Sequence, residues 1–282
     1  MLEFQLFRIK VVQLSQTALF SRRDIKPSEL LKEAIVSLPK DDKERMLIWH
    51  IGNIEEVDNN GLYFRIGRTT PQTTERYKDG VFVEEMDEIA PYTHVLIDIE
   101  KEVCAIAKKI KVSPTSKGTA RQLIRLLNYS EIKKRDNIEF EISDIKDPDD
   151  FISHIKKAHS VSKYWLTFSR PNPIDNDDLV VKPLEAMLQG LGADKGKTEF
   201  DGKDLDRERL ETLSRSIAAT GEEAGATIKK NEKDRGTRRR LRGNPVIIKV
   251  EDVAREKGHH LELLKIIRST YENIRRKNND KE

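Results

Sequence analysis

The sequence predicts an α+β protein with two lobes: a strand-rich lobe with antiparallel hairpins over residues 1–130, and a mixed α/β lobe over residues 131–282. Three observations support this prediction. Apolar residues mostly alternate with polar ones in the first half, strand and helix periods alternate in the second, and a polar stretch at 129–137 separates the halves. At 282 residues and 37% hydrophobic content, the chain is long enough to bury a substantial core.

The N-terminal lobe is expected to form an antiparallel meander with a helix packed against it. Period-two alternation predicts strands at residues 2–12, 46–57, 62–69, 93–99 and 103–112. The tetrapeptide Asp58-Asn59-Asn60-Gly61 is typical of a tight hairpin turn, since Asn and Gly tolerate positive φ. Helices are predicted at 27–38, begun by Pro27, and at 116–128, capped by Thr115 or Ser116.

The C-terminal lobe is expected to combine helices and strands, to carry a basic hairpin arm and to end in a long helix. Strands are predicted at 138–145, 162–169, 223–231 and 238–250. Helices are predicted at 148–158, 177–190, 206–219 and 252–277. The apolar stripe of the last helix is suited to burial and is one reason to expect a homodimer.

Composition excludes several classes of protein. Cys104 is the single cysteine and lies in an apolar, strand-like setting, so disulfide scaffolds and Cys-rich zinc sites are excluded. The first ten residues alternate and predict a strand, because a signal peptide needs roughly 7–15 unbroken apolar residues. No stretch approaches the ~20 apolar residues of a membrane span. A cytoplasmic protein without membrane insertion and without a cofactor is expected.

Positive charge is concentrated in one segment, although the net charge of the chain is only +3. Between residues 229 and 242, eight basic residues stand against two acidic ones, a net charge of +6. The basic residues are Lys229, Lys230, Lys233, Arg235, Arg238, Arg239, Arg240 and Arg242. They lie between two predicted strands, so we expect an exposed hairpin that binds phosphates by charge and by the planar fork of arginine. A solvated loop, or an arm that grips an acidic partner protein, would show the same pattern.

A second group of cations is predicted on the helix 116–128. Lys117, Arg121 and Arg125 are spaced four apart and share one helix face. Such a stripe is usually a solvent face, but free N–H groups at the helix N-terminus could receive a phosphate beside it. These three residues are therefore added to the candidate nucleic-acid contacts.

Catalytic motifs are absent. The six histidines form no HExxH pair and none has a cysteine neighbour; a GxSxG elbow and a Walker A loop are also missing. One grouping supports an enzymatic alternative. Asp144 and Lys146 lie at the end of one predicted strand and Asp98 lies on another. Carboxylates near a lysine are what a metal-dependent nuclease uses to hold Mg²⁺ and activate water. Salt-bridged strand ends are the simpler interpretation, so no catalytic or metal residue is predicted.

One predicted strand is rich in aromatic residues. Tyr164, Trp165 and Phe168 fall within 162–169, before the turn Arg170-Pro171-Asn172-Pro173. Aromatic residues at such positions are more often core than a base-stacking platform, so we expect them in the core.

Three segments resemble a known family in their order along the chain. They are Ala105-Ile106-Ala107-Lys108-Lys109 with Ser113-Pro114-Thr115-Ser116 and Leu123, then Leu184, Leu188 and Leu191-Gly192-Ala193, then Glu223-Ala224-Gly225 before a basic strand pair. In this order the chain resembles the RexA-like family of phage lambda exclusion proteins and related bacterial antiphage proteins. The resemblance implies a two-lobed, homodimeric, sequence-tolerant DNA-binding protein without enzymatic activity. The chain departs from it in the density of arginine at 235–242, so family contact residues are not transferred.

The sequence as a whole predicts a sequence-independent nucleic-acid-binding protein, with duplex DNA as its favoured partner. It is expected to act as a homodimer in phage exclusion or antiphage defence, where a partner protein of a defence system could join it. RNA is the binding alternative, because backbone contacts dominate both. The metal-dependent nuclease with Asp98, Asp144 and Lys146 is the enzymatic alternative.

Overall fold

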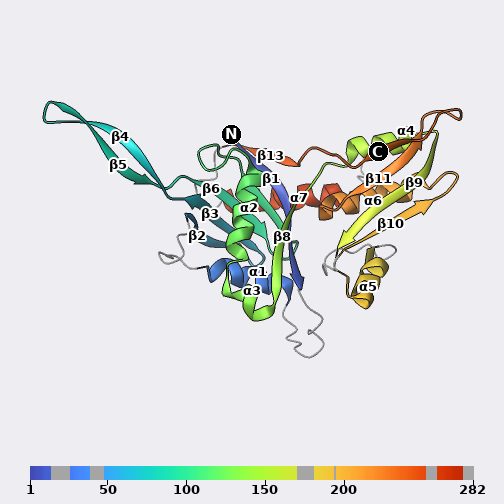
Figure 1. The fold of residues 1–282 in the computed structure, drawn as a ribbon, viewed down its shortest axis with the longest axis horizontal. Helices are drawn as coiled ribbons and strands as arrows, with labels where there is room; N and C mark the ends of the chain where they lie inside the picture. Colours follow the sequence, from blue (N-terminus) through green and yellow to red (C-terminus); the bar gives the residue numbers. More distant parts are fainter. Residues whose placement is uncertain (14–25, 39–47, 170–180, 194, 252–258, 276–282) are drawn as a thin grey trace.

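The computed structural model describes residues 1–13, 26–38, 48–169, 181–193, 195–251 and 259–275. Within these residues the chain has seven helices and thirteen strands. The strands form a seven-stranded, a four-stranded and a two-stranded sheet. Figure 1 shows the three sheets following one another along the long axis of the molecule, with the two-stranded sheet at one end and the four-stranded sheet at the other. The predicted mixed α+β class is confirmed.

The seven-stranded sheet is organised around one long strand. Its members are β1 (Leu2–Gln13), β2 (Trp49–Asp58), β3 (Gly61–Arg68), β6 (Tyr92–Asp98), β7 (Val103–Ala107), β8 (Ile138–Asp144) and β13 (Ile247–Val250). The order is β13-β1-β7-β6-β3-β2, and β8 also pairs with β1. β13 pairs with residues 2–5 of β1 and β8 with residues 7–13, while β7 takes the opposite edge. One strand thus joins segments from both ends and the middle of the chain.

Helices cover both faces of this sheet. The helices α1 (Pro27–Val36), α2 (Ser116–Leu127) and α3 (Glu131–Asp136) bury Leu31, Leu123 and Ile132 against one face. The helix α7 (His259–Arg275) packs Leu264 and Tyr271 against the other. Because β1 alternates, Phe7 joins the first core and Leu6 the second.

The described helices cover only one face of the four-stranded sheet, and we call its other face the open face. Its order is β10 (Lys195–Asp201), β9 (Ser160–Ser169), β11 (Ala224–Lys229) and β12 (Thr237–Arg240). Its covered face forms a third core with α4 (Asp149–Lys157), α5 (Val181–Leu191) and α6 (Arg207–Thr220). In the described part of the chain no helix packs on its other face. None of the described helices is long and apolar enough to cross a membrane.

The third sheet is a hairpin that projects from the body of the molecule. It consists of β4 (Thr70–Lys78) and β5 (Val81–Ile89), paired from Thr70 with Ile89 to Lys78 with Val81. We call residues 70–89 the acidic arm. Its turn is Asp79-Gly80, both at positive φ, as a two-residue hairpin turn requires. The sequence interpretation assigned no element here, because a ribbon with two solvated faces lacks the apolar alternation by which strands are recognised.

Most predicted elements are present, with differences at their ends. The turn at residues 58–61 is confirmed, although none of its residues has positive φ, and so is the Thr115 cap of α2. The α7 stripe is buried as predicted except for Leu261, which is exposed. The strand β7 ends at Ala107, five residues earlier than predicted. The helix α3 and the strand β10 were not predicted. Residues 177–180 and 252–258, where two predicted helices begin, lie outside the described residues, as does the turn at residues 170–173.

The predicted strand 238–250 is wrong as a single element. The structure divides it into β12 and β13, which belong to different sheets. The division falls at Gly243-Asn244-Pro245. A Cβ at Gly243 would lie 1.8 Å from the carbonyl oxygen of Asp147, and proline has no N–H for a ladder. The close packing of Gly243 against Asp147 and the missing N–H of Pro245 therefore interrupt the strand. β12 ends in the four-stranded sheet, and β13 begins in the seven-stranded one.

The membership of the sheets crosses the predicted lobe boundary at residue 130. The strands β8 and β13 pair with β1, and α7 packs on the same sheet, although all three come from the C-terminal half. The four-stranded sheet with α4, α5 and α6 forms its own core from residues 151–241. The division into lobes 1–130 and 131–282 stays a prediction.

A buried ion pair joins the two larger sheets. The ammonium of Lys10, on β1, lies 2.6 Å from a carboxylate oxygen of Glu222 and donates to the hydroxyl of Ser169 on β9 at 2.9 Å. Ser169 and Thr167 in turn donate to Glu222. Burial opposes the ionised form of Glu222, but Lys10 and the two hydroxyl groups outweigh it, so the pKa of this carboxyl is lowered.

We expect Lys10→Met to lower the free energy of unfolding by about 3 kcal/mol at pH 7, because it leaves the carboxylate of Glu222 buried without its cation. The lowered pKa of Glu222 means that its stabilisation is complete above about pH 4.3 and is lost as pH falls through the folded-state value. The difference in free energy of unfolding between the variant and the wild type should therefore become smaller below about pH 4. Urea unfolding over a pH series measures both effects.

The control is Lys195→Met, which removes an exposed lysine that lies 3.6 Å from Glu141. An exposed pair contributes about 0–1 kcal/mol, so this variant should unfold almost like the wild type. Equal losses in the two variants would contradict the role of Lys10.

Candidate nucleic-acid interface

The basic cluster predicted from sequence lies on the hairpin β11–β12, at the edge of the four-stranded sheet. We call residues 229–242 the basic hairpin. The register pairs Gly225 with Arg240 and Thr227 with Arg238. Asn231 and Asp234 close the loop, since each backbone N–H donates to an oxygen of the other residue. Strand β12 has a neighbour on one side only, so its outer edge is free in the described part of the chain.

The cations of the basic hairpin are directed to solvent. Seven of the eight predicted residues are exposed, and Lys229 is half-buried. Within the described residues none of the eight forms an ion pair with another side chain. Arg238 to Arg240 lie on strand β12 itself, where a hairpin tip was predicted, and the loop occupies residues 230–236. The structure thus keeps the whole cluster together and leaves its charge uncompensated.

Alternation along β12 divides its arginines between two faces. Residues paired directly across an antiparallel ladder point to the same side of the sheet. Arg239 pairs with Ala226, whose side chain is in the core, whereas Arg238 and Arg240 pair with Thr227 and Gly225 on the uncovered face. The basic hairpin therefore adds two arginines to the open face of the sheet.

The open face holds an aromatic side chain that was expected in the core. Tyr164 and Phe168 are core residues, as predicted, but Trp165 points to the other side of β9 and is half-buried. A Cβ at Gly225 would lie 2.5 Å from the indole Nε1, so this glycine lets the ring approach the backbone of β11. The ammonium of Lys197 lies 4.6 Å from the ring centroid, within the range of a cation–π contact.

On the open face, the cations are paired with acids to different extents on the β10 side and on the β12 side. Lys163 lies 2.8 Å from Asp201 and 3.0 Å from Glu199, both on β10, and these hydrogen bonds raise its pKa. Lys163 is therefore already neutralised by its own chain. Arg238 and Arg240, on the other side of Trp165, have no such partner in the described residues. Apart from Lys197, which lies over the indole, the uncompensated positive charge lies on the β12 side of the face.

Sequence reasoning missed Trp165, Lys197 and Gly225, although the aromatic strand held a usable pattern. In Tyr164-Trp165-Leu166-Thr167-Phe168, period two puts Trp165 and Thr167 opposite the other three residues. Grouping the aromatics by composition concealed that alternation. The strand β10, which carries Lys197, was not predicted, so its contribution to the face could not be foreseen.

The cations of α2 lie apart from the basic hairpin. The helix packs on the seven-stranded sheet, whereas β12 borders the four-stranded one, at the end of the molecule (Figure 1). Lys117 is engaged with Asp144 at 2.5 Å, and Thr115 accepts the N–H of Gly118 at the helix N-terminus. Arg121 and Arg125 are exposed. The structure thus does not join the two predicted groups into one surface.

The three residues of the nuclease alternative do not converge. Asp98 binds Arg268 of α7, and Asp144 binds Lys117 of α2, so the two carboxylates lie on opposite faces of the seven-stranded sheet. β7 and β1 separate their strands, about 14 Å across the ladder. Lys146 follows β8 in a bridge with Pro245. Among the described residues, no three His, Cys, Asp or Glu side chains gather as they would around a metal ion.

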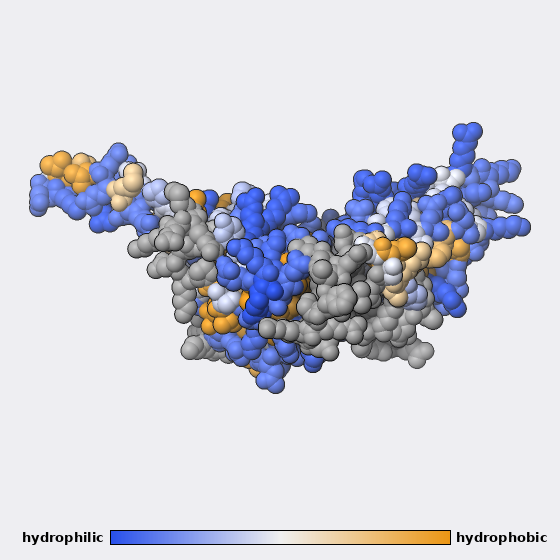
Figure 2. All heavy atoms as spheres, turned by 60° about the horizontal axis from the view of Figure 1, so that its bottom comes forward, coloured by the Kyte–Doolittle hydropathy of each residue, from blue (hydrophilic) through white to orange (hydrophobic). Residues whose placement is uncertain are grey.

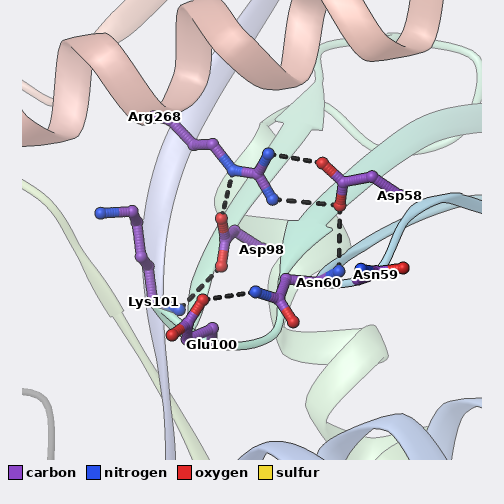
Figure 3. Close-up of a pocket in the computed structure, with 7 residues that line it drawn as sticks. All are labelled: Asp58, Asn59, Asn60, Asp98, Glu100, Lys101 and Arg268. Atoms are coloured by element: carbon purple, nitrogen blue, oxygen red, sulfur yellow. Dashed lines mark hydrogen bonds and ion pairs between the residues drawn. The ribbon is translucent and has the colours of Figure 1, made fainter.

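A pocket of about 450 Å³ lies where α7 crosses the turns of the seven-stranded sheet. Figure 3 shows Arg268 between Asp58 and Asp98. Its guanidinium lowers the pKa of Asp58, and the two carboxylates in turn raise the pKa of Arg268. These charges are satisfied by each other. The pocket therefore contains an ion-pair network that fastens α7 to the sheet, rather than groups free to bind a ligand.

Comparison with known proteins provides one match. A family model described as "Domain of unknown function (DUF4747)" matches residues 12–252. No curated protein matches the chain. The matched range includes the four-stranded sheet, the basic hairpin and most of the seven-stranded sheet.

Proposed function

Because this chain belongs to the DUF4747 family, which is described only as a domain of unknown function, we propose from its geometry that it binds nucleic acid without sequence preference, with duplex DNA as the main partner. One observation carries the proposal. The basic hairpin holds a net charge of +6 on an edge strand and its loop, with none of its cations paired inside the described chain. The phosphates of a DNA backbone would supply the negative charges that these cations lack within the described chain.

The proposed mechanism is electrostatic. Lysine and arginine side chains of the hairpin neutralise phosphates and release condensed counterions, which favours binding most strongly at low salt. A two-stranded ribbon is also narrow enough to follow a groove or a backbone. Arg121 and Arg125 of α2 are proposed as a second, separate contact that a long duplex could reach.

The resemblance to RexA-like exclusion proteins suggests a setting for this binding. We propose that the protein acts in antiphage defence, as a homodimer with or without a further defence protein. The apolar stripe of α7 was one reason to expect a dimer, but α7 buries Leu264 and Tyr271 within its own chain. The dimer proposal therefore needs another surface.

The open face of the sheet supports a second candidate, the binding of RNA or single-stranded DNA. An indole on a sheet face, flanked by cations, is a platform on which an unpaired base can stack. Trp165 has this position, with Lys197 beside it and Arg240 across Gly225. A duplex keeps its bases stacked inside, so only an unpaired strand would use the indole.

The protein is proposed to bind nucleic acid without cutting it. Hydrolysis of a phosphodiester at neutral pH generally needs metal-held carboxylates, or an acid and a base around the phosphate. Asp98 and Asp144, the acids of the nuclease alternative, are separated by the sheet and each binds a cation. Arginine, which dominates the hairpin, stays protonated and cannot act as a base.

Arg238→Ala/Arg240→Ala should weaken duplex binding by roughly 10–100-fold at about 0.1 M salt on every sequence tested, and make the salt dependence shallower by about two units. Fluorescence anisotropy with labelled duplexes over a salt series measures both. Arg239→Ala, on the other face of β12, should weaken duplex binding less than the double substitution does.

The matched control for that experiment is Lys134→Ala/Lys265→Ala, which removes two exposed cations from α3 and α7. Its affinity should stay within about twofold of the wild type. If the folded hairpin variant binds with unchanged affinity and salt slope, the basic hairpin is not the contact.

For the second candidate, Trp165→Ala should weaken binding to single strands by about 1–3 kcal/mol, the usual worth of one stacked base, and leave duplex binding unchanged. Trp165→Phe should recover most of the loss, since an aromatic face is kept. Equal effects of Trp165→Ala on single strands and duplexes, or no effect on either, would rule out base stacking at this position.

Supercoiled plasmid, linear duplex and RNA should remain intact after incubation with excess protein and Mg²⁺ or Mn²⁺, while their gel mobility shifts. Intact length on a denaturing gel is the measurement. Cleavage that is abolished by Asp144→Ala, but not by the neighbouring Glu141→Ala, would instead support the nuclease alternative.

A further inference from the structure

The acidic arm holds charge opposite in sign to the basic hairpin. Residues 70–89 include six acidic and two basic side chains, a net charge of −4. The arm projects into solvent at one end of the molecule, and the sheet that carries the basic hairpin lies at the other (Figure 1). The two segments of one chain are thus too far apart to neutralise each other.

The register separates the arm into two different faces. On one face Arg76 pairs with Asp87 at 2.8 Å, and Lys78 pairs with Glu85, so both cations are used. The opposite face carries three acids, Glu75, Glu84 and Glu88, with no cation among them. In the described residues none of these three forms an ion pair.

That same face is also apolar. Phe82 and Met86 are 82% and 78% exposed, and Tyr77 lies beside Phe82 with ring centroids 4.9 Å apart. Figure 2 shows hydrophobic side chains gathered at the end of the arm, in contrast to the polar surface at the opposite end of the molecule. A projecting hairpin that exposes large apolar side chains is typical of a surface that a partner covers.

We propose that the acidic arm of one copy of this protein binds the basic hairpin of a second copy. The complementary charges are one reason for choosing a second copy as the occupant. The side chains are complementary as well: arginine can pair with Glu84 or Glu75 and lie over the rings of Tyr77 and Phe82.

The spacing of the two segments fits such a contact. Arg238 and Arg240 are two residues apart on β12, about 7 Å, and so are Phe82 and Glu84 on β5. Among the described residues β12 is an edge strand and both strands of the arm have a free edge, so main-chain pairing can add to the side-chain contacts.

Two copies lying antiparallel would make this contact twice, once at each end, and close a two-fold dimer. The contact supplies the surface that the dimer proposal needs, and because it uses Arg238 and Arg240 it would compete with nucleic acid for the basic hairpin. For this reason the experiment uses protein freed of nucleic acid by nuclease treatment and a high-salt wash.

Light scattering on the full chain should give a mass above 32.6 kDa at about 50 mM salt and tens of micromolar protein. The mass should fall to that of one chain at about 0.5 M salt, where charges are screened. Glu75→Lys/Glu84→Lys in the arm, and Arg238→Glu/Arg240→Glu in the hairpin, should each weaken association at least tenfold. Phe82→Ser/Met86→Ser, which keeps all charges, should weaken it too.

Mixing the two charge-reversed variants should restore association, because the reversed arm of one then meets the reversed hairpin of the other. Such rescue also shows that both variants are folded. The matched control is Glu208→Lys/Glu262→Lys, an equal change of charge at exposed helix positions, which should associate like the wild type. A wild type of one-chain mass at low salt, association unaffected by either reversal, or failure of the mixture to associate would overturn the proposal.

Discussion

Two buried cations on β1 hold the parts of this molecule together. Arg8 and Lys10 alternate onto the face of the strand that is otherwise apolar, and both are almost completely buried. Arg8 donates to the hydroxyl of Tyr271 on α7, and Lys10 binds Glu222 beside the four-stranded sheet. A buried charge is tolerated only when its hydrogen bonds are satisfied, so these contacts require α7 and the second sheet to take defined positions. The basic hairpin is placed by the sheet that Lys10 anchors.

Charge is distributed along the molecule in a way that the net charge of +3 conceals. The basic hairpin carries +6 and the acidic arm −4, which leaves +1 on all the rest. These two segments are hairpins at opposite ends of the molecule (Figure 1), so solvent screens their charges from each other. A surface of this kind can attract a polyanion at one end and a cationic partner at the other. Both proposals made for the protein follow from this polarity, because the basic hairpin can bind either a polyanion or the acidic arm of a second copy.

The sequence predicted those elements in which burial of one face requires apolar residues at a regular spacing. The strands β1, β3 and β6 and the stripe of α7 were found for this reason. The acidic arm and β10 were missed, because strands with solvated faces have no apolar period to detect. In the candidate site, too, local patterns were visible in the sequence and contacts between distant strands were not. The basic cluster was visible as a run of eight cations, whereas the place of Trp165 beside Arg240 depends on three strands in register.

The sequence by itself determined the α+β class, the hairpin at residues 58–61 and the concentration of cations at 229–242, since each depends on neighbours a few residues apart. Only the tertiary structure decided that β13 leaves the basic hairpin to join β1, that Asp98 and Asp144 lie on opposite faces, and that Trp165 faces outward with Arg238 and Arg240. These outcomes depend on pairing between distant segments, such as β13 with β1 and β9 with β11. Local periodicity carries no information about which distant strands will pair, because pairing is chosen by the burial of whole faces.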